Sequence, residues 1–180
     1  MIKINKKYTN CDYNEILEKW SESHRYYHNI NHLQNLIELI NNLGISGIEY
    51  DKLILTAIYH DIIYDPKSLT NEEDSADFFI KNVKIIDNDM LDVKQMILDT
   101  KNHIPSNDLS KLFIEFDMDI LNRNFLDLVK YEDGISKEYS FTENYITKRI
   151  EFLNNIIDKY PNNKNNLLKL IDYIKQKKPL

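Results

Sequence analysis

The amino-acid sequence predicts an all-α protein, and three observations lead to that prediction. Only three glycines and four prolines interrupt 180 residues, so few turn signals are present to separate strands. Ile, Asn, Leu and Lys are the commonest residues. Apolar side chains recur with a helical period over long stretches of the chain. We therefore expect about eight or nine helices folded into one compact domain, residues 1–180, of a size that suits a single core.

The first half of the chain is expected to form five helices. Capping boxes predict where two of them begin, at Asp12-Tyr-Asn-Glu15 and at Thr70-Asn-Glu-Glu73. Apolar spacing and Pro or Gly stop signals predict the other three: from about Tyr27 to Gly44, from about Tyr50 to Ile63, and from Asp87 or Asn88 to a point before Pro105.

The second half is expected to form three or four more helices. Asp108 is a candidate cap for a helix that runs to Ile120. The remaining helices are expected at 125–129, at about 139–160 and at 167–174. The segments 64–69 and 102–107 are the two longer connections, and both follow residues with candidate chemistry.

Composition and charge exclude several classes of protein. The formal net charge is −6, and the only basic run is the short tail Lys175–Lys178, so non-specific nucleic-acid binding is disfavoured. The N-terminal residues contain no apolar segment of signal-peptide length, and no run approaches the length of a membrane span. Cys11 is the only cysteine, which fits a reducing compartment. We expect a cytoplasmic protein without a membrane partner, and Tyr-rich and Leu-rich faces leave room for a homodimer.

Four residues form a candidate metal site. His60 and Asp61 are adjacent near the end of a predicted helix, His28 lies upstream and Asp117 lies downstream. Together they offer two imidazole nitrogens and two carboxylates. This mixed set suits one divalent ion, Mn, Fe, Co, Ni, Zn or Mg, with open positions for water and substrate. Such an ion would activate water and polarise a phosphoryl oxygen.

The downstream carboxylate has a competitor. Asp117 follows Phe113, Ile114 and Phe116, so it is expected to point into a largely apolar region, where a carboxylate needs a cation or hydrogen bonds. Asp119 lies two positions on and points elsewhere on a helix. The residues alone leave both open.

Other polar residues could serve a phosphate. His32 is four residues after His28, one helical turn, and Arg25 is three residues before it. Arginine binds phosphate oxygens in a bidentate fork. Lys101 and His103 follow the fifth predicted helix and could add positive charge. Each also has an ordinary interpretation: a core histidine, a surface ion pair, or cations that favour a helix C-terminus.

Several blocks resemble a known family. Arg25-Tyr-Tyr-His-Asn-Ile-Asn-His32, Ala57-Ile-Tyr-His-Asp-Ile-Ile-Tyr-Asp65 and Asn71-Glu-Glu-Asp-Ser-Ala76 resemble the HD-domain superfamily of metal-dependent phosphohydrolases, in its branch of predicted metal-dependent phosphohydrolases. Thr100-Lys-Asn-His103 and Asp117-Met-Asp-Ile-Leu-Asn122 follow in the same order. The resemblance covers about residues 20–140, with the helices of 141–177 expected to pack on that core.

The resemblance implies an all-helical fold with an ion at its centre, and it favours Asp117 over Asp119. The metal ligands that it implies are His28, His60, Asp61 and Asp117. The catalytic candidates that it adds are Asp65, Glu72, Glu73, His32 and His103, and the substrate-binding candidates are Arg25 and Lys101. The chain departs from the family pattern at Asn102, Asn122 and Ser136, the last of which stands where relatives have an arginine.

These expectations favour an enzyme that cleaves a phosphate ester of a small nucleotide-like substrate with a metal-activated water. One alternative is an HD-type di-iron oxygenase, which needs two further histidines between Asp61 and Asp117, where this chain has only His103. The other alternative is a non-catalytic helical domain that binds a nucleotide or a protein partner.

Overall fold

The computed structural model describes residues 7–177, whose regular secondary structure is helical apart from one isolated bridge. This part contains nine α-helices and three short 3-10 helices, and its only β pairing is an isolated bridge between Thr9 and Val83. The all-α prediction is therefore confirmed. The α-helices are α1 (Tyr13–Trp20), α2 (Ile30–Asn42), α3 (Ile48–Tyr59), α4 (Asn71–Asn82), α5 (Asn88–Asp99), α6 (Asp108–Asp117), α7 (Phe125–Glu138), α8 (Glu143–Ile156) and α9 (Lys164–Gln176).

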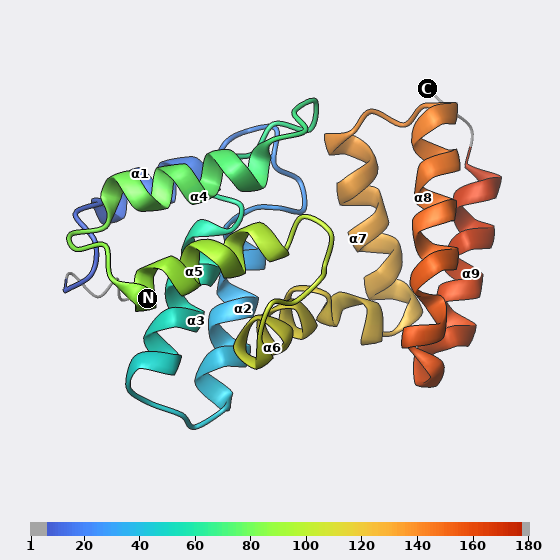
Figure 1. The fold of residues 1–180 in the computed structure, drawn as a ribbon. Coiled ribbons are helices and arrows are strands. Elements are labelled where there is room, and N and C mark those ends of the chain that lie inside the picture. Colours follow the sequence, from blue (N-terminus) through green and yellow to red (C-terminus); the bar gives the residue numbers. More distant parts are fainter. Residues whose placement is uncertain (1–6, 178–180) are drawn as a thin grey trace. The chain divides into compact units, whose positions relative to one another are not determined.

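The chain forms two units, Met1–Asp117 and Met118–Leu180. In the first unit, α3 contacts α2, α4, α5 and α6 (Figure 1). Its residues from Leu53 to Tyr59 are all buried. A helix that is apolar on every side must be covered on every side, and the run Leu-Ile-Leu-Thr-Ala-Ile-Tyr meets that condition. The apolar core of this unit is thus built around α3.

Several helix ends in this unit differ from the sequence prediction, and three of the differences concern candidate residues. Helix α6 ends at Asp117 rather than Ile120. Helix α2 begins at Ile30 rather than Tyr27, because the Asn29 side chain accepts a hydrogen bond from the backbone N–H of Asn31. His28 therefore precedes the helix. Helix α3 ends at Tyr59 rather than Ile63, with His60 as its C-cap residue.

The second unit consists of α7, α8 and α9 with the 3-10 helices Asp119–Asn122, Ile157–Lys159 and Pro161–Asn163. The three α-helices run side by side, and α9 packs against both others (Figure 1). Helix α7 continues to Glu138, well beyond the expected Val129, and α8 begins only at Glu143. The break lies at Ser140, whose φ of 61° no helix tolerates, and Thr142 then caps α8 through the N–H of Tyr145. No helix in the described residues is long and apolar enough to cross a membrane.

Candidate metal centre

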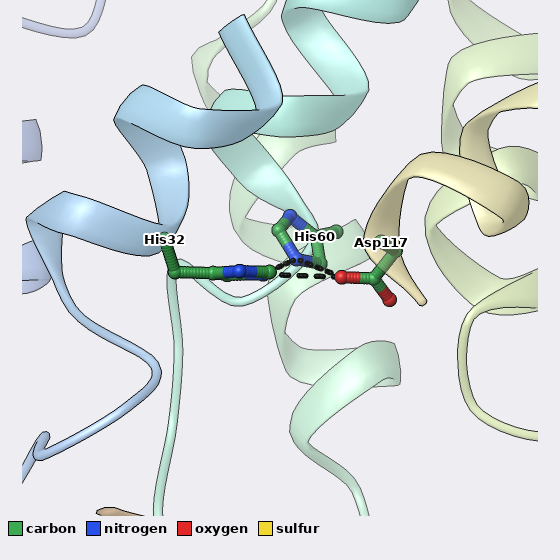
Figure 2. Close-up of side chains that lie close together, drawn as sticks. All are labelled: His32, His60 and Asp117. Carbon is green, nitrogen blue, oxygen red and sulfur yellow. Dashed lines mark hydrogen bonds and ion pairs between the residues drawn. The ribbon is translucent and has the colours of Figure 1, made fainter. Parts of the chain in front are cut away.

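Three side chains from three helices converge in the first unit. His32 comes from the first turn of α2, His60 from the C-cap of α3 and Asp117 from the last position of α6. His32 Nε2 lies 3.1 Å from Asp117 Oδ1 and 3.3 Å from His60 Nε2. His60 Nε2 lies 3.5 Å from the same carboxylate oxygen. Figure 2 shows the three side chains pointing toward one another.

The spacing of these three atoms fits a shared ion. Two ligand atoms bound at a tetrahedral angle with bonds of about 2.0–2.1 Å are about 3.3 Å apart. The separations of 3.1, 3.3 and 3.5 Å lie on either side of that value. The group of His32, His60 and Asp117 could therefore hold a metal ion.

The hydrogen bonds of His60 decide which of its nitrogens is available. Its Nδ1 lies 3.0 Å from the carbonyl oxygen of Ala57, which can only accept, so Nδ1 carries the hydrogen and donates it. In the neutral ring, Nε2 then presents a lone pair. That lone pair faces Asp117 Oδ1 and also Asp61 Oδ2, which is 3.2 Å away. Acceptors that face one another require a cation between them, either a proton or a metal ion.

Aromatic rings enclose the two histidines. The ring of His60 lies 5.6 Å from that of Trp20 and 5.4 Å from that of Phe113, and the ring of Tyr27 lies 5.2 Å from that of His32. The Trp20 indole N–H donates to the carbonyl oxygen of Ile58, which fixes the indole against α3. These contacts hold both imidazoles in place and lower the local dielectric, which strengthens any charge interaction in the group.

The charges of the group act on one another's pKa values. Burial alone would lower the pKa of His60, but the carboxylates of Asp61 and Asp117 outweigh it and hold that pKa well above its usual range. Burial would raise the pKa of Asp117, yet hydrogen bonds from His32 and His60 hold it well below its usual range. The pKa of Asp61 is lowered as well: the charge of His60 outweighs the effect of burial. The group thus favours negative carboxylates around a positive centre.

The other two expected ligands lie at the edge of this group. Asp61 contacts His60 Nε2 but does not belong to the mutually close set of three. The ring of His28 lies 6.0 Å from that of His32 and 4.5 Å from that of Tyr64. Its charge also helps to lower the pKa of Asp61. The structure therefore brings His60 and Asp117 together with His32, and places Asp61 and His28 beside them.

The acidic candidates on α4 differ in their surroundings. Burial raises the pKa of Glu72, and the charge of Asp61 raises it further, so Glu72 is electrostatically linked to the group. Glu73 instead forms an ion pair with Lys101, which lowers the pKa of the Glu73 carboxyl. Lys101 also donates to the carbonyl oxygen of Leu69 over 2.7 Å, and so joins the end of α5 to the loop before α4.

Two further candidates lie in turns. Asp65 is exposed, and its carboxylate accepts the backbone N–H of Lys67 in a local turn. His103 follows α5 in a turn where its φ is 52°, a left-handed conformation that is uncommon for residues other than glycine. The competing carboxylate, Asp119, pairs with Arg123 in the second unit.

Arg25, expected to bind substrate, is buried among main-chain carbonyls. Its Nη1 donates to the carbonyl oxygens of His28 (3.1 Å) and Asp61 (2.8 Å), and its Nη2 donates to that of Ile62 (3.1 Å). Its Nε donates to the Glu22 carboxylate. The guanidinium therefore bridges the loop before α2 and the turn after α3.

The sequence interpretation gave His32 a catalytic role rather than a place among the ligands. A signal for its burial is present, because His32, Leu36 and Ile40 recur every four residues and all three are buried on α2. Because imidazole is polar, His32 was not counted as part of the buried face of this helix. Comparison of the chain with protein-family models, curated proteins and solved structures found no match in any of the three.

Proposed function

We propose that this protein is a metal-dependent phosphohydrolase of the HD-domain superfamily, with one divalent ion held by His32, His60 and Asp117. Asp61 is the fourth ligand in this proposal, and His28 lies beside it. When bound, the ion would lower the pKa of a water molecule and polarise a phosphoryl oxygen. The observation that carries the proposal is the convergence of two imidazole nitrogens and one carboxylate oxygen within 3.5 Å, from three separate helices.

The chain's own residues have separate tasks in this proposal. The Ala57 carbonyl fixes the tautomer of His60, so that Nε2 is the nitrogen that would bind the ion. Glu72 is proposed to hold or release a proton, because burial and the charge of the Asp61 carboxylate raise its pKa. Lys101 and His103 are proposed to offset the negative charge of a phosphate, with Glu73 holding Lys101 in position.

The substrate class rests on the motif resemblance. The order of blocks from Arg25 to Asn122 supports a small, nucleotide-like phosphate ester. The net charge of −6 supports a small substrate over nucleic acid, since clustered cations are needed to replace the counterions of a polynucleotide. A cytoplasmic location remains part of this proposal.

Metal analysis followed by an activity screen tests the function. Protein purified without chelator is expected to contain about one ion per chain and to hydrolyse nucleotides or generic phosphate esters with Mn²⁺, Co²⁺ or Ni²⁺. Asp117→Asn should lose both the ion and the activity, whereas Asp119→Asn, two positions away, should keep both. Chelator treatment should abolish turnover, and returning the metal should restore it.

Three other results would overturn the proposal in distinct ways. Two tightly bound irons per chain would indicate the oxygenase class. A bound ion without turnover on any phosphorylated metabolite would indicate a binding domain. The absence of any ion, together with wild-type behaviour of Asp117→Asn, would remove the metal site itself.

A further inference from the structure

Arg25 is the most completely enclosed cation of the first unit for which contacts are described. Its side chain is fully buried, at 0% exposure. Four of its five N–H groups donate to partners within the chain, three of them to carbonyl oxygens. Its guanidinium carbon also lies 5.4 Å from the ring centroid of Trp20 and 5.2 Å from that of Tyr64.

These contacts leave little of the guanidinium for a substrate. A bidentate phosphate contact needs two parallel N–H groups that point into open space. Both N–H groups of Nη1 are directed at carbonyl oxygens, and Nε is paired with Glu22. Withdrawing the arginine toward a phosphate would leave the carbonyls of His28, Asp61 and Ile62 without this donor in a buried region.

The carbonyls that Arg25 binds belong to two candidate metal residues and their neighbour. Nη1 alone joins His28, before α2, to Asp61, after α3, although these residues are 33 positions apart in the sequence. The side chain of Asp61 lies 3.2 Å from His60 Nε2. A single planar fork therefore fixes the backbone from which both the His28 and Asp61 side chains project.

We propose that Arg25 is a positioning residue, which sets the His28 loop and the Asp61 turn against the group of His32, His60 and Asp117 and does not itself bind phosphate. This inference rests on the proposed function, because it assumes that the group binds a metal ion. Residues that orient metal ligands through such outer contacts typically contribute 10–100-fold to metal affinity.

Cobalt binding to metal-free protein tests the inference without any substrate. Co²⁺ affinity and the visible absorption of the bound ion would be measured for wild type, Arg25→Gln and Arg25→Lys. We expect both variants to bind Co²⁺ about 10–100-fold more weakly, with an altered spectrum. Lysine keeps the charge but offers one nitrogen in place of the fork, so it should not restore wild-type affinity.

Two control variants separate positioning from general damage. Val93→Ala removes buried apolar volume from α5, which carries none of the proposed ligands, and should lower the denaturation midpoint without changing Co²⁺ affinity. Glu22→Gln removes the ion pair to Nε but leaves the three carbonyl bonds, so it should also bind Co²⁺ normally. If Arg25→Gln does not fold, Arg25→Lys decides the question.

Failure of the positioning role and failure of the proposed function give different results. Wild-type Co²⁺ affinity and spectrum in Arg25→Lys would overturn positioning, and weaker binding of inorganic phosphate by the same variant would then indicate substrate contact with an intact metal site. Equal weakening of Co²⁺ binding in Val93→Ala would reduce Arg25 to a fold-stabilising residue. Failure of wild type to bind Co²⁺ or Mn²⁺ would overturn the proposed function and this inference together.

Discussion

Both ring nitrogens of His60 interact with groups of the candidate metal centre or of its own helix. One nitrogen is committed to the Ala57 carbonyl, and the other faces two carboxylates and a second imidazole. In the absence of metal, a proton on Nε2 must satisfy those carboxylates. Proton and metal therefore compete for the same position, and metal affinity should rise with pH until the ring is fully deprotonated.

The same charges should make the stability of metal-free protein depend on pH. Because the folded pKa of His60 is raised, its contribution is complete below about pH 6.5 and is lost as pH rises through the folded value. Because the folded pKa of Asp117 is lowered, its contribution is complete above about pH 3.9 and is lost as pH falls through the folded value. Urea denaturation in the presence of chelator should show a larger stability loss for wild type than for His60→Gln as pH rises above about 6.5. Parallel pH profiles would contradict this account.

The two histidines of the Arg25–His32 block provide a second test at this scale. His32 Nε2 belongs to the group of three, whereas His28 lies beside it. His32→Ala should therefore weaken metal binding by more than about 100-fold, and His28→Ala by about 100-fold or less, as expected for an outer partner. Isothermal titration with Zn²⁺ or Co²⁺ measures both. The reverse order would mean that His28, as the family resemblance implies, is the stronger ligand.

At the scale of elements, a buried ion pair joins α7 to α8 in the second unit. Arg149 Nε donates to Glu132 Oε2 over 2.8 Å, and the Tyr145 hydroxyl donates to Glu132 Oε1 over 2.6 Å. Glu132 is fully buried. Arg149 also lies over the rings of Tyr131 and Phe152. Arg149 on α8 is therefore linked to α7 by an ion pair and by a cation–π contact.

Breaking this pair from one side should be costly. Arg149→Met leaves the Glu132 carboxylate buried with only the Tyr145 hydroxyl, and we expect it to destabilise the protein by about 3–5 kcal/mol. Adding Glu132→Leu removes the uncompensated charge and should recover a large part of the loss. Chemical denaturation followed by circular dichroism measures both variants. A cost below about 1 kcal/mol for Arg149→Met would show that water reaches the carboxylate.

At the scale of the whole chain, every proposed ligand lies within Met1–Asp117. A ligand stabilises the folded state of the region that binds it. Hydrogen exchange with and without Co²⁺ should therefore show added protection in α2, α3 and α6, and little change in α7, α8 and α9. Equal protection throughout both units would mean that they open as one cooperative body.

The sequence predicted the helices well where one apolar period runs between clear signals. Asp87 caps α5 through the N–H of Met90, as one of the two expected candidates. The sequence predicted helix ends poorly where a tertiary contact or a single backbone angle determines the end of the helix. Nothing in the local pattern shows that Ser140 adopts a positive φ, so α7 was expected too short and α8 too long. The sequence also shows no linker at the boundary between the two units.

The sequence predicted part of the candidate site, where a polar residue interrupts or ends an apolar run. Asp117 stands out as a carboxylate in an apolar run, and His60-Asp61 as a polar end to one. Whether His28 or His32 reaches the group depends on where α2 begins, and the Asn29 cap determines that point. Local sequence spacing does not predict the contacts of Arg25 with carbonyl oxygens far along the chain, because it does not show whether an arginine is buried or exposed.

The burial of α3 on every side has a consequence for the tolerance of this protein to change. His60 is delivered by a helix with no exposed residue between Leu53 and Tyr59. A slip of one residue along that helix would rotate the imidazole by about 100° and move it by about 1.5 Å. The packing of these seven side chains therefore sets the position of His60. Insertions or deletions within Leu53–Tyr59 should reduce metal binding as much as loss of His60 does.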